Sequence, residues 1–185
     1  MADSFPIANY RLEAGSSLQR ARLVMFMQRA YRDMGHGATH QGKPQQTTDK
    51  QTTDKHGTGD HLADTVQRHL SSQSQLWWLI DEKAAALPAG MPGTTSLEPV
   101  GCLWMGEAID QRSGLKQAYV FLLYIAAAHR HQGLGTALMN HAQDWAKQKG
   151  YQHMSLQVFE DNAAAMTLYE KLGYQSQAKW MSLEL

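Results

Sequence analysis

The stretch that decides the fold runs from Tyr119 to Lys149 and reads YVFLLYIAAAHRHQGLGTALMNHAQDWAKQK. It opens with a continuous apolar run, which is typical of a buried strand. A turn containing Arg130, Gly133 and Gly135 follows, and apolar residues then recur at helical spacing over 133–149. Such a turn leaves backbone N–H groups free at the helix N-terminus, where a phosphate can bind. The sequence therefore predicts an anion site here, and the rest of the chain is interpreted around it.

Composition restricts the classes of protein to which the chain can belong. The 185 residues carry 17 basic and 17 acidic side chains, so no basic field favours nucleic acid or a membrane surface. Cys102 is the single cysteine, which excludes an intrachain disulfide and cysteine-rich zinc sites. The opening stretch MADSFPIANYRLEAG lacks the build of a signal peptide, and no apolar run reaches membrane length. We expect a cytoplasmic protein without nucleic-acid or membrane partners.

Hydrophobic periodicity predicts the elements that precede the decisive stretch. They are a strand over 7–12, helices over 16–32 and 60–72, and strands over 76–80, 100–109 and 116–126. Leu18, Ala21, Val24 and Met25 should supply the apolar stripe of the first helix. A turn at 111–114 joins the strands on either side of it, which predicts an antiparallel meander.

Residues 36–59 differ in character from the rest of the chain. They contain no large apolar side chain, and the pentapeptide QTTDK occurs twice in succession, at 46–50 and 51–55. Such a segment cannot bury enough surface to offset the entropy lost on ordering. We expect a flexible low-complexity insertion within a single domain that spans 1–185. The nearby histidines are irregularly spaced and lack carboxylate or thiolate partners, so no metal site is expected.

The C-terminal third predicts a further strand and helix pair. A strand is expected over 153–159, a helix capped by Asn162 and closed by Gly173, and a last strand or hairpin over 174–185. The full order of elements predicts an α/β (α+β) fold. Its core would be a mixed, largely antiparallel sheet of six to seven strands flanked by helices.

Single residues exclude three other motifs that combine a strand, glycines and a helix. A Rossmann fingerprint needs a small residue where Leu138 stands, and a P-loop needs a lysine between Gly135 and Thr136. A nucleophile elbow would place serine between the two glycines, where the chain has Leu134.

The pattern that remains, Arg-x-x-Gly-x-Gly at 130–135, resembles the acetyl-CoA signature of the GNAT superfamily of N-acetyltransferases. The residues that match the downstream part of the family pattern are Asn162, Ala165, Tyr169, Gly173 and Tyr174. The resemblance is specific over about 100–175. It implies a GNAT-like acyl-CoA N-acyltransferase fold, and direct transfer of an acetyl group from acetyl-CoA to a primary amine in a ternary complex, without a metal.

The resemblance also implies which residues bind the coenzyme. They are Tyr124, Ile125, Arg130, His131, Gln132, Gly133, Leu134, Gly135, Thr136, Asn162, Ala165 and Tyr169. A bulge is implied in the strand that ends at Tyr124-Ile125, with a free N–H near Ile125 facing the thioester oxygen. The same strand should part from Gln157-Val158 and open a slot for the pantetheine arm.

Two side chains are candidates for proton transfer. Tyr169 could protonate the departing thiolate, or it could be a core tyrosine, since leucines flank it on the same helical face. Glu107 lies on the same strand face as Met105, and partial burial would raise its pKa toward that of a useful base; alternatively it faces solvent. Glu160 and His129 are weaker candidates, and water alone could accept the proton.

Other functions remain open at this level. A non-catalytic acyl-CoA-binding or sensor module would keep the loop without turnover, and an acyltransferase for longer acyl-CoA would differ in the width of the slot. The acceptor could be a small-molecule amine or an amine of a peptide or protein, and a homodimer is also open. Cys102 lies in an apolar strand and is interpreted as a core residue.

Overall fold

The computed structural model describes residues 5–35, 60–83 and 98–184. The insertion predicted at 36–59 lies outside these residues. The described elements are β1 (Tyr10–Ala14), α1 (Arg20–Asp33), α2 (Asp60–His69), β2 (Gln75–Asp81), β3 (Gly101–Ile109), β4 (Lys116–Ile125), α3 (Leu134–Gln148), β5 (Met154–Leu156) and α4 (Ala163–Lys171). No helix within these ranges is long and apolar enough to cross a bilayer.

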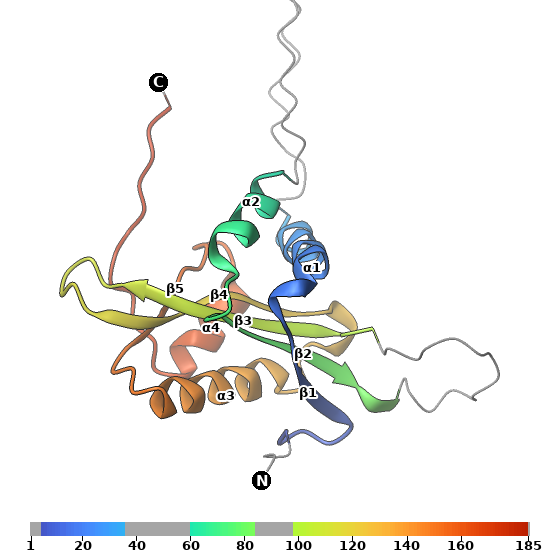
Figure 1. Cartoon of the computed structure of the whole chain (residues 1–185). Helices are drawn as coiled ribbons and strands as arrows, with labels where there is room; N and C mark the ends of the chain where they lie inside the picture. Colours follow the sequence, from blue (N-terminus) through green and yellow to red (C-terminus); the bar gives the residue numbers. More distant parts are fainter. Residues whose placement is uncertain (1–4, 36–59, 84–97, 185) are drawn as a thin grey trace, which may run out of the picture.

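The strands form a five-stranded sheet in the order β1-β2-β3-β4-β5 (Figure 1). The first four are antiparallel neighbours, whereas β4 and β5 are parallel and are joined through α3. The predicted mixed sheet and its antiparallel meander are therefore confirmed. Between β3 and β4, Asp110 accepts hydrogen bonds from the Arg112 N–H at 3.0 Å and the Ser113 hydroxyl at 2.7 Å, which forms the turn.

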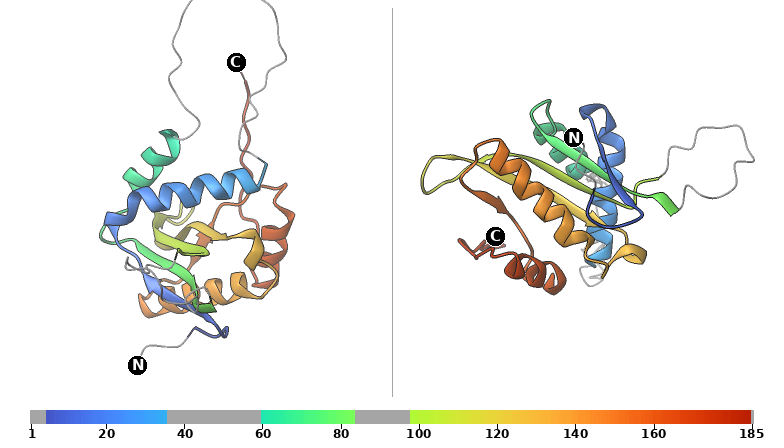
Figure 2. Two further views of the ribbon diagram at one scale, coloured as in Figure 1. Left: turned by 90° about the vertical axis from the view of Figure 1, so that its right-hand side faces the viewer. Right: turned by 90° about the horizontal axis from the view of Figure 1, so that it is seen from below.

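Helices cover both faces of the sheet, with α1 and α2 on one face and α3 and α4 on the other (Figure 2). The first face buries a cluster that includes Phe26 of α1, Val66 of α2, and Trp78 and Trp104 of the sheet. The second buries the α3 side chains against the sheet. Its α3 members are Leu134, Leu138, Met139, Ala142 and Ala146. Each face is therefore stabilised by the apolar stripe of its own helices.

Of the apolar stripe predicted for the first helix, Val24 packs against the core as expected, but the positions at Leu18, Ala21 and Met25 are wrong. Leu18 is 92% exposed and Met25 is 42% exposed, whereas the residues buried on α1 are Leu23, Phe26, Met27 and Ala30. The chain enters α1 through a 3₁₀ turn at Ser17–Gln19. Because a 3₁₀ turn advances three residues per turn, Leu18 is out of phase with α1, whereas Ala21 and Met25 lie within α1 on its exposed face.

The predicted six to seven strands are also wrong, since the described residues form five. Residues 174–184, predicted as a last strand or hairpin, contain no strand and extend away from the sheet (Figure 1). Trp180, Met181 and Leu183 of this segment are 83–84% exposed. An alternating apolar pattern specifies a strand only when a neighbouring edge pairs with it, and β5 spans just three residues.

We expect Leu138→Ala to lower the free energy of unfolding by about 2–5 kcal/mol, because it leaves a cavity between α3 and the sheet at a fully buried position. Chemical denaturation measures the change. Leu18→Ala is the matched control and should change stability by less than about 0.5 kcal/mol, because Leu18 is exposed. Equal losses for the two variants would contradict the assignment of the core.

Candidate functional site

β4 and β5 part after a short stretch of pairing, and we use the word slot for the region along β4 beyond that point. Their parallel pairing covers three residue pairs and ends at Val120 and Leu156. Beyond this point β4 continues to Ile125, while β5 has ended. The predicted separation at Gln157-Val158 is therefore confirmed. Along the slot, β4 keeps its pairing with β3 on one side, and its other edge presents backbone N–H and C=O groups that no strand of the described residues uses.

The β-bulge in β4 lies at Phe121 and not near Ile125. The register with β3 shifts there, since Trp104 pairs with Leu122 and Met105 pairs with Val120, whereas Ile125 stays in register with Gly101. The bulge reverses the faces of the strand. Val120 contributes to the core under α3, but Leu122 contributes to the core under α1 and α2. The predicted position was wrong because an unbroken apolar run does not reveal where a strand changes face.

The glycine turn places the N-terminus of α3 at the open end of the slot. Gly133 is the residue before the helix, and its φ of 77° is a left-handed conformation that glycine adopts readily. His131 also has a positive φ of 61°. The first-turn N–H groups of Leu134, Gly135 and Thr136 have no carbonyl partner four residues earlier within the helix. Such free N–H groups and the helix dipole favour an anion, so the predicted anion site remains an expectation at this helix N-terminus.

Gly135 allows α4 to approach the first turn of α3. A Cβ added at this position would lie 3.1 Å from Leu168 Cδ2 and 3.8 Å from Ile125 Cδ1. The glycine turn, the end of β4 and α4 therefore meet at one place. Tyr169, the residue after Leu168, is half-buried in the same region. The elements that carry the residues of the sequence pattern are thus packed against one another.

Tyr169 holds its proton strongly. Burial raises its pKa to about 12, and the nearby Tyr174 contributes to the rise. The two rings lie 5.7 Å apart in an edge-on arrangement. No described residue forms a hydrogen bond with the Tyr169 hydroxyl. It is therefore a neutral phenol at physiological pH, with a donor free for another partner.

Asn162 caps α4 as predicted. Its side-chain oxygen accepts a hydrogen bond from the Ala165 N–H at 3.1 Å, and its Nδ2 donates to Met34 Sδ at 3.3 Å. The cap therefore also connects α4 to the end of α1. Met34 lies 128 residues away in the chain, so no local sequence pattern reveals this contact.

Arg130 has protein partners that the sequence did not reveal. Its Nε donates to the Ile125 carbonyl at 2.8 Å, and its Nη2 pairs with Asp33 Oδ2 at the end of α1. The Tyr124 hydroxyl donates to the same Asp33 oxygen at 3.2 Å. Burial raises the pKa of Tyr124, and the Asp33 carboxylate adds to the rise. The sequence does not indicate the pairing of Asp33 with Arg130, because 97 residues separate them.

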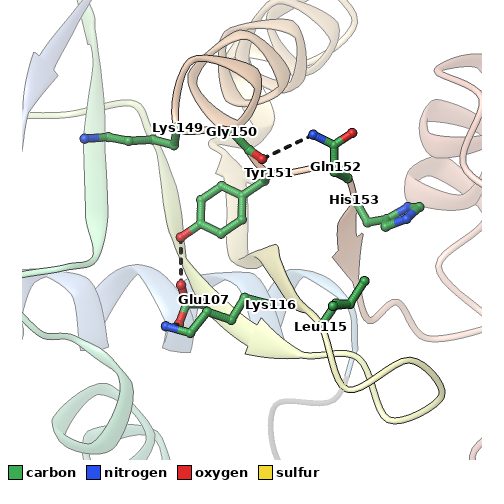
Figure 3. Close-up of a pocket in the computed structure, with 8 residues that line it drawn as sticks. All are labelled: Glu107, Leu115, Lys116, Lys149, Gly150, Tyr151, Gln152 and His153. Carbon is green, nitrogen blue, oxygen red and sulfur yellow. Dashed lines mark hydrogen bonds and ion pairs between the residues drawn. The ribbon is translucent and has the colours of Figure 1, made fainter.

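Glu107 lies far from the slot. It faces a hollow of about 380 Å³ at the opposite end of β4 (Figure 3). One carboxylate oxygen is 2.8 Å from Lys116 Nζ, and the other accepts a hydrogen bond from the Tyr151 hydroxyl at 3.0 Å. The hydrogen bonds from Lys116 and Tyr151 lower the pKa of Glu107, so the predicted rise of its pKa is wrong. In the register of β3 and β4, Glu107 lies opposite Ala118, and Gly101 lies opposite Ile125. The stretch of β3 from Gly101 to Glu107 is about 20 Å long, so Glu107 is about that far from the end of β4 at Ile125.

Two further candidates also have structural roles. The His129 Nδ1 lies 2.9 Å from the Tyr10 hydroxyl and 3.9 Å from Asp81 Oδ2, on the β1 side of the glycine turn. Cys102 is fully buried, and burial raises the pKa of its thiol, so it belongs to the core as predicted. In the described ranges, no three His, Cys, Asp or Glu side chains converge as a metal site would require.

Comparison with known proteins identifies relatives of this chain. The model of the acetyltransferase (GNAT) family matches residues 54–174. The uncharacterised N-acetyltransferase YobR of Bacillus subtilis is 35% identical over 77 residues, which are 42% of this chain and 29% of YobR. A Mus musculus protein assigned as member 5 of N-acetyltransferase family 8 is 27% identical over 67% of this chain and 48% of its own length. The chain thus spans less than half the length of either relative.

Solved structures share the fold. A protein of Pyrococcus furiosus assigned as an acetyl transferase has a TM-score of 0.64 at 18% identity, with 95% of this chain and 99% of that chain covered. An acetyltransferase from Clostridium acetobutylicum, solved with acetyl-CoA, has a TM-score of 0.62 at 13% identity and covers 95% and 96%. An aminoglycoside acetyltransferase from a soil metagenomic sample, solved with sisomicin, has a TM-score of 0.59 at 12% identity and covers 96% and 97%.

We expect Asn162→Ala to lower the free energy of unfolding by about 1 kcal/mol, because the Ala165 N–H loses its cap. Thermal or chemical denaturation measures the loss. Asn162→Asp should retain most of the stability, because aspartate caps a helix equally well. Asn140→Ala, at an exposed position within α3, is the control and should not destabilise the protein. An unchanged stability for Asn162→Ala would show that the cap contributes nothing.

Proposed function

The chain belongs to the acetyltransferase (GNAT) family, and on that premise we propose that it transfers an acetyl group from acetyl-CoA to a primary amine. The observation that carries the proposal is the slot between β4 and β5, which leads from the glycine turn at the N-terminus of α3. The fold shared with the acetyltransferase solved with acetyl-CoA supports the choice of coenzyme.

The residues around the slot fit an acyl-CoA in chemical type. We assign the diphosphate to the free N–H groups of the turn and of the first turn of α3, where backbone donors and the helix dipole favour an anion. The pantetheine arm, which carries amides, would lie along the edge of β4 that no described strand pairs, near Tyr124 and Ile125, where the Ile125 carbonyl already accepts from Arg130 Nε. The other residues of this proposed site are Arg130, His131, Gln132, Gly133, Leu134, Gly135, Thr136, Asn162, Ala165 and Tyr169.

The proposed reaction is a direct transfer. The lone pair of the neutral amine attacks the thioester carbonyl carbon, a C–N bond forms, the C–S bond breaks, and the amine loses one proton to water. Tyr169 donates its proton to the departing thiolate. Its pKa of about 12 exceeds that of a thiol by about 3.5 units. Such an acid transfers its proton late, when the C–S bond is largely broken and the sulfur carries most of the charge.

Water takes the role of the base in this proposal. Glu107 is excluded from it by position, since Lys116 and Tyr151 hold its carboxylate at the end of β4 that lies away from the slot. A carboxylate in these two bonds also has a lowered pKa, which makes it a weaker base than a free one.

The acceptor that we propose is a small-molecule amine. The shared fold of the aminoglycoside acetyltransferase solved with sisomicin supports this class, because sisomicin carries amines. A peptide or protein amine is the alternative. A panel that contains polyamine, aminoglycoside and peptide amines, read by release of free thiol, separates the two classes and also separates an enzyme from a non-catalytic binder.

We expect acetyl-CoA and free coenzyme A to raise the melting temperature, because a ligand that binds only the native state stabilises it by about 2.7 kcal/mol at one hundred times its Kd. A thermal-shift titration measures the rise. ADP is the control that tests for diphosphate recognition alone and should have a smaller effect. The proposal fails if neither form of the coenzyme changes the melting temperature.

We expect Tyr169→Phe to lower kcat by about 10²-fold or more, because the thiolate then departs without its acid. Steady-state kinetics at saturating acetyl-CoA measures the effect. Tyr151→Phe is the matched control, since its hydroxyl contacts Glu107 away from the slot, and it should leave kcat within about twofold. Retention of full activity by Tyr169→Phe would show that Tyr169 is a core residue.

A further inference from the structure

The last turn of α1 contacts both walls of the slot. On the β4 side, Asp33 pairs with Arg130 and accepts a hydrogen bond from the Tyr124 hydroxyl at 3.2 Å. On the α4 side, Met34 Sδ accepts from Asn162 Nδ2 at 3.3 Å. α1 is therefore linked to both elements between which the slot opens.

Asp33 occupies an unfavourable position for the helix itself. It is the last residue of α1, where a carboxylate faces the negative end of the helix dipole. Asp33 and Arg130 are partly buried, at 30% and 38% side-chain exposure. Among the described residues, the contacts that stabilise the Asp33 carboxylate are thus those with Arg130 and Tyr124. Asp33 therefore stabilises the region of the slot rather than α1.

The contacts of Arg130 are directed at the protein. Its Nε donates to the Ile125 carbonyl, its Nη2 pairs with Asp33, and its guanidinium carbon lies 5.8 Å from the centre of the Tyr124 ring. Ile125 is the last residue of β4, and Arg130 follows the one-turn helix at Ala127–His129. One side chain therefore ties the start and the end of this short connection together, and Asp33 fixes that side chain.

We infer that Asp33 is a positioning residue for the coenzyme loop. By fixing Arg130 and Tyr124, it sets where the N-terminus of α3 lies relative to the end of β4, and Arg130 then serves the loop's conformation rather than contacting the diphosphate. The inference rests on the proposed function, since the loop it positions is the proposed diphosphate site.

The direction in which Asp33→Asn changes the affinity for the coenzyme distinguishes this role from direct contact between Arg130 and the diphosphate. If Arg130 contacted the diphosphate directly, Asp33 would compete with the phosphates for the guanidinium, and removal of its negative charge would strengthen binding. If Asp33 positions the loop, its removal weakens binding because the loop must be ordered when the coenzyme binds. The two models therefore predict opposite changes in affinity for Asp33→Asn.

Calorimetric titration of the full chain with coenzyme A, combined with steady-state kinetics, tests the inference. We expect Asp33→Asn to raise the Kd for coenzyme A and the KM for acetyl-CoA about five- to tenfold, the size expected for a weakened charged hydrogen bond, with kcat changed less than about twofold. Asp33→Glu should restore part of the affinity. Asp144→Asn, which removes an exposed carboxylate on α3 that pairs with Lys147 at 3.7 Å, is the matched control and should bind as the parent does.

A double variant tests whether Asp33 acts through Arg130. Arg130→Met should weaken binding alone, and Asp33→Asn should add little in the Arg130→Met background, because the coupled contact is already lost. Unchanged or tighter coenzyme binding by Asp33→Asn overturns the inference, and so do additive losses in the double variant.

A measurement without the coenzyme keeps the inference separate from the proposed function. The Arg130 Nε–H should exchange slowly with solvent in the NMR spectrum of the parent and rapidly in Asp33→Asn, while the melting temperature verifies that the variant is folded. If the parent does not bind coenzyme A, the proposed function and the positioning role fail together, even if the contact is observed. If the parent binds and the Nε–H of Arg130 exchanges rapidly in it, the inference alone fails.

Discussion

The limited pairing between β4 and β5 is the constraint on which the candidate site depends. β4 pairs with β3 along its whole length, but with β5 over three residues only. The bulge at Phe121 switches the side that alternate residues face, so Val120 contributes to the core under α3 and Leu122 to the core under α1 and α2. Full pairing with β5 would satisfy the free edge of β4 and close the slot. The site is therefore a region where the sheet is left incomplete.

Three helices stabilise this open region without filling it. α3 presents its N-terminus, and Gly135 allows Leu168 of α4 to pack against the first turn of α3. Met34, at the end of α1, contacts the Asn162 cap of α4. These contacts join elements that the sheet does not join. The same contacts would allow a change in α1 to alter coenzyme affinity.

Sequence reasoning succeeded where a signal is local. The start of α3 after Gly133 and the cap at Asn162 follow from backbone groups within four residues, and both are confirmed. Sequence patterns did not predict which face of α1 is buried, because that depends on how the helix docks on the sheet, or the pKa of Glu107, which depends on Lys116 and on the distant Tyr151. Contacts across the sheet depend on register, which a single strand does not encode.

The sequence by itself determined the order of the elements, the glycine turn and the candidate residues of the family pattern, because these depend on periodicity and on local hydrogen bonds. Only the tertiary structure decided which candidates meet. It packed α4 against the glycine turn, paired Arg130 with Asp33, and bound the Glu107 carboxylate to Lys116 at the other end of β4. The reason is physical: residues far apart in the chain interact only after the register and the packing have placed them side by side.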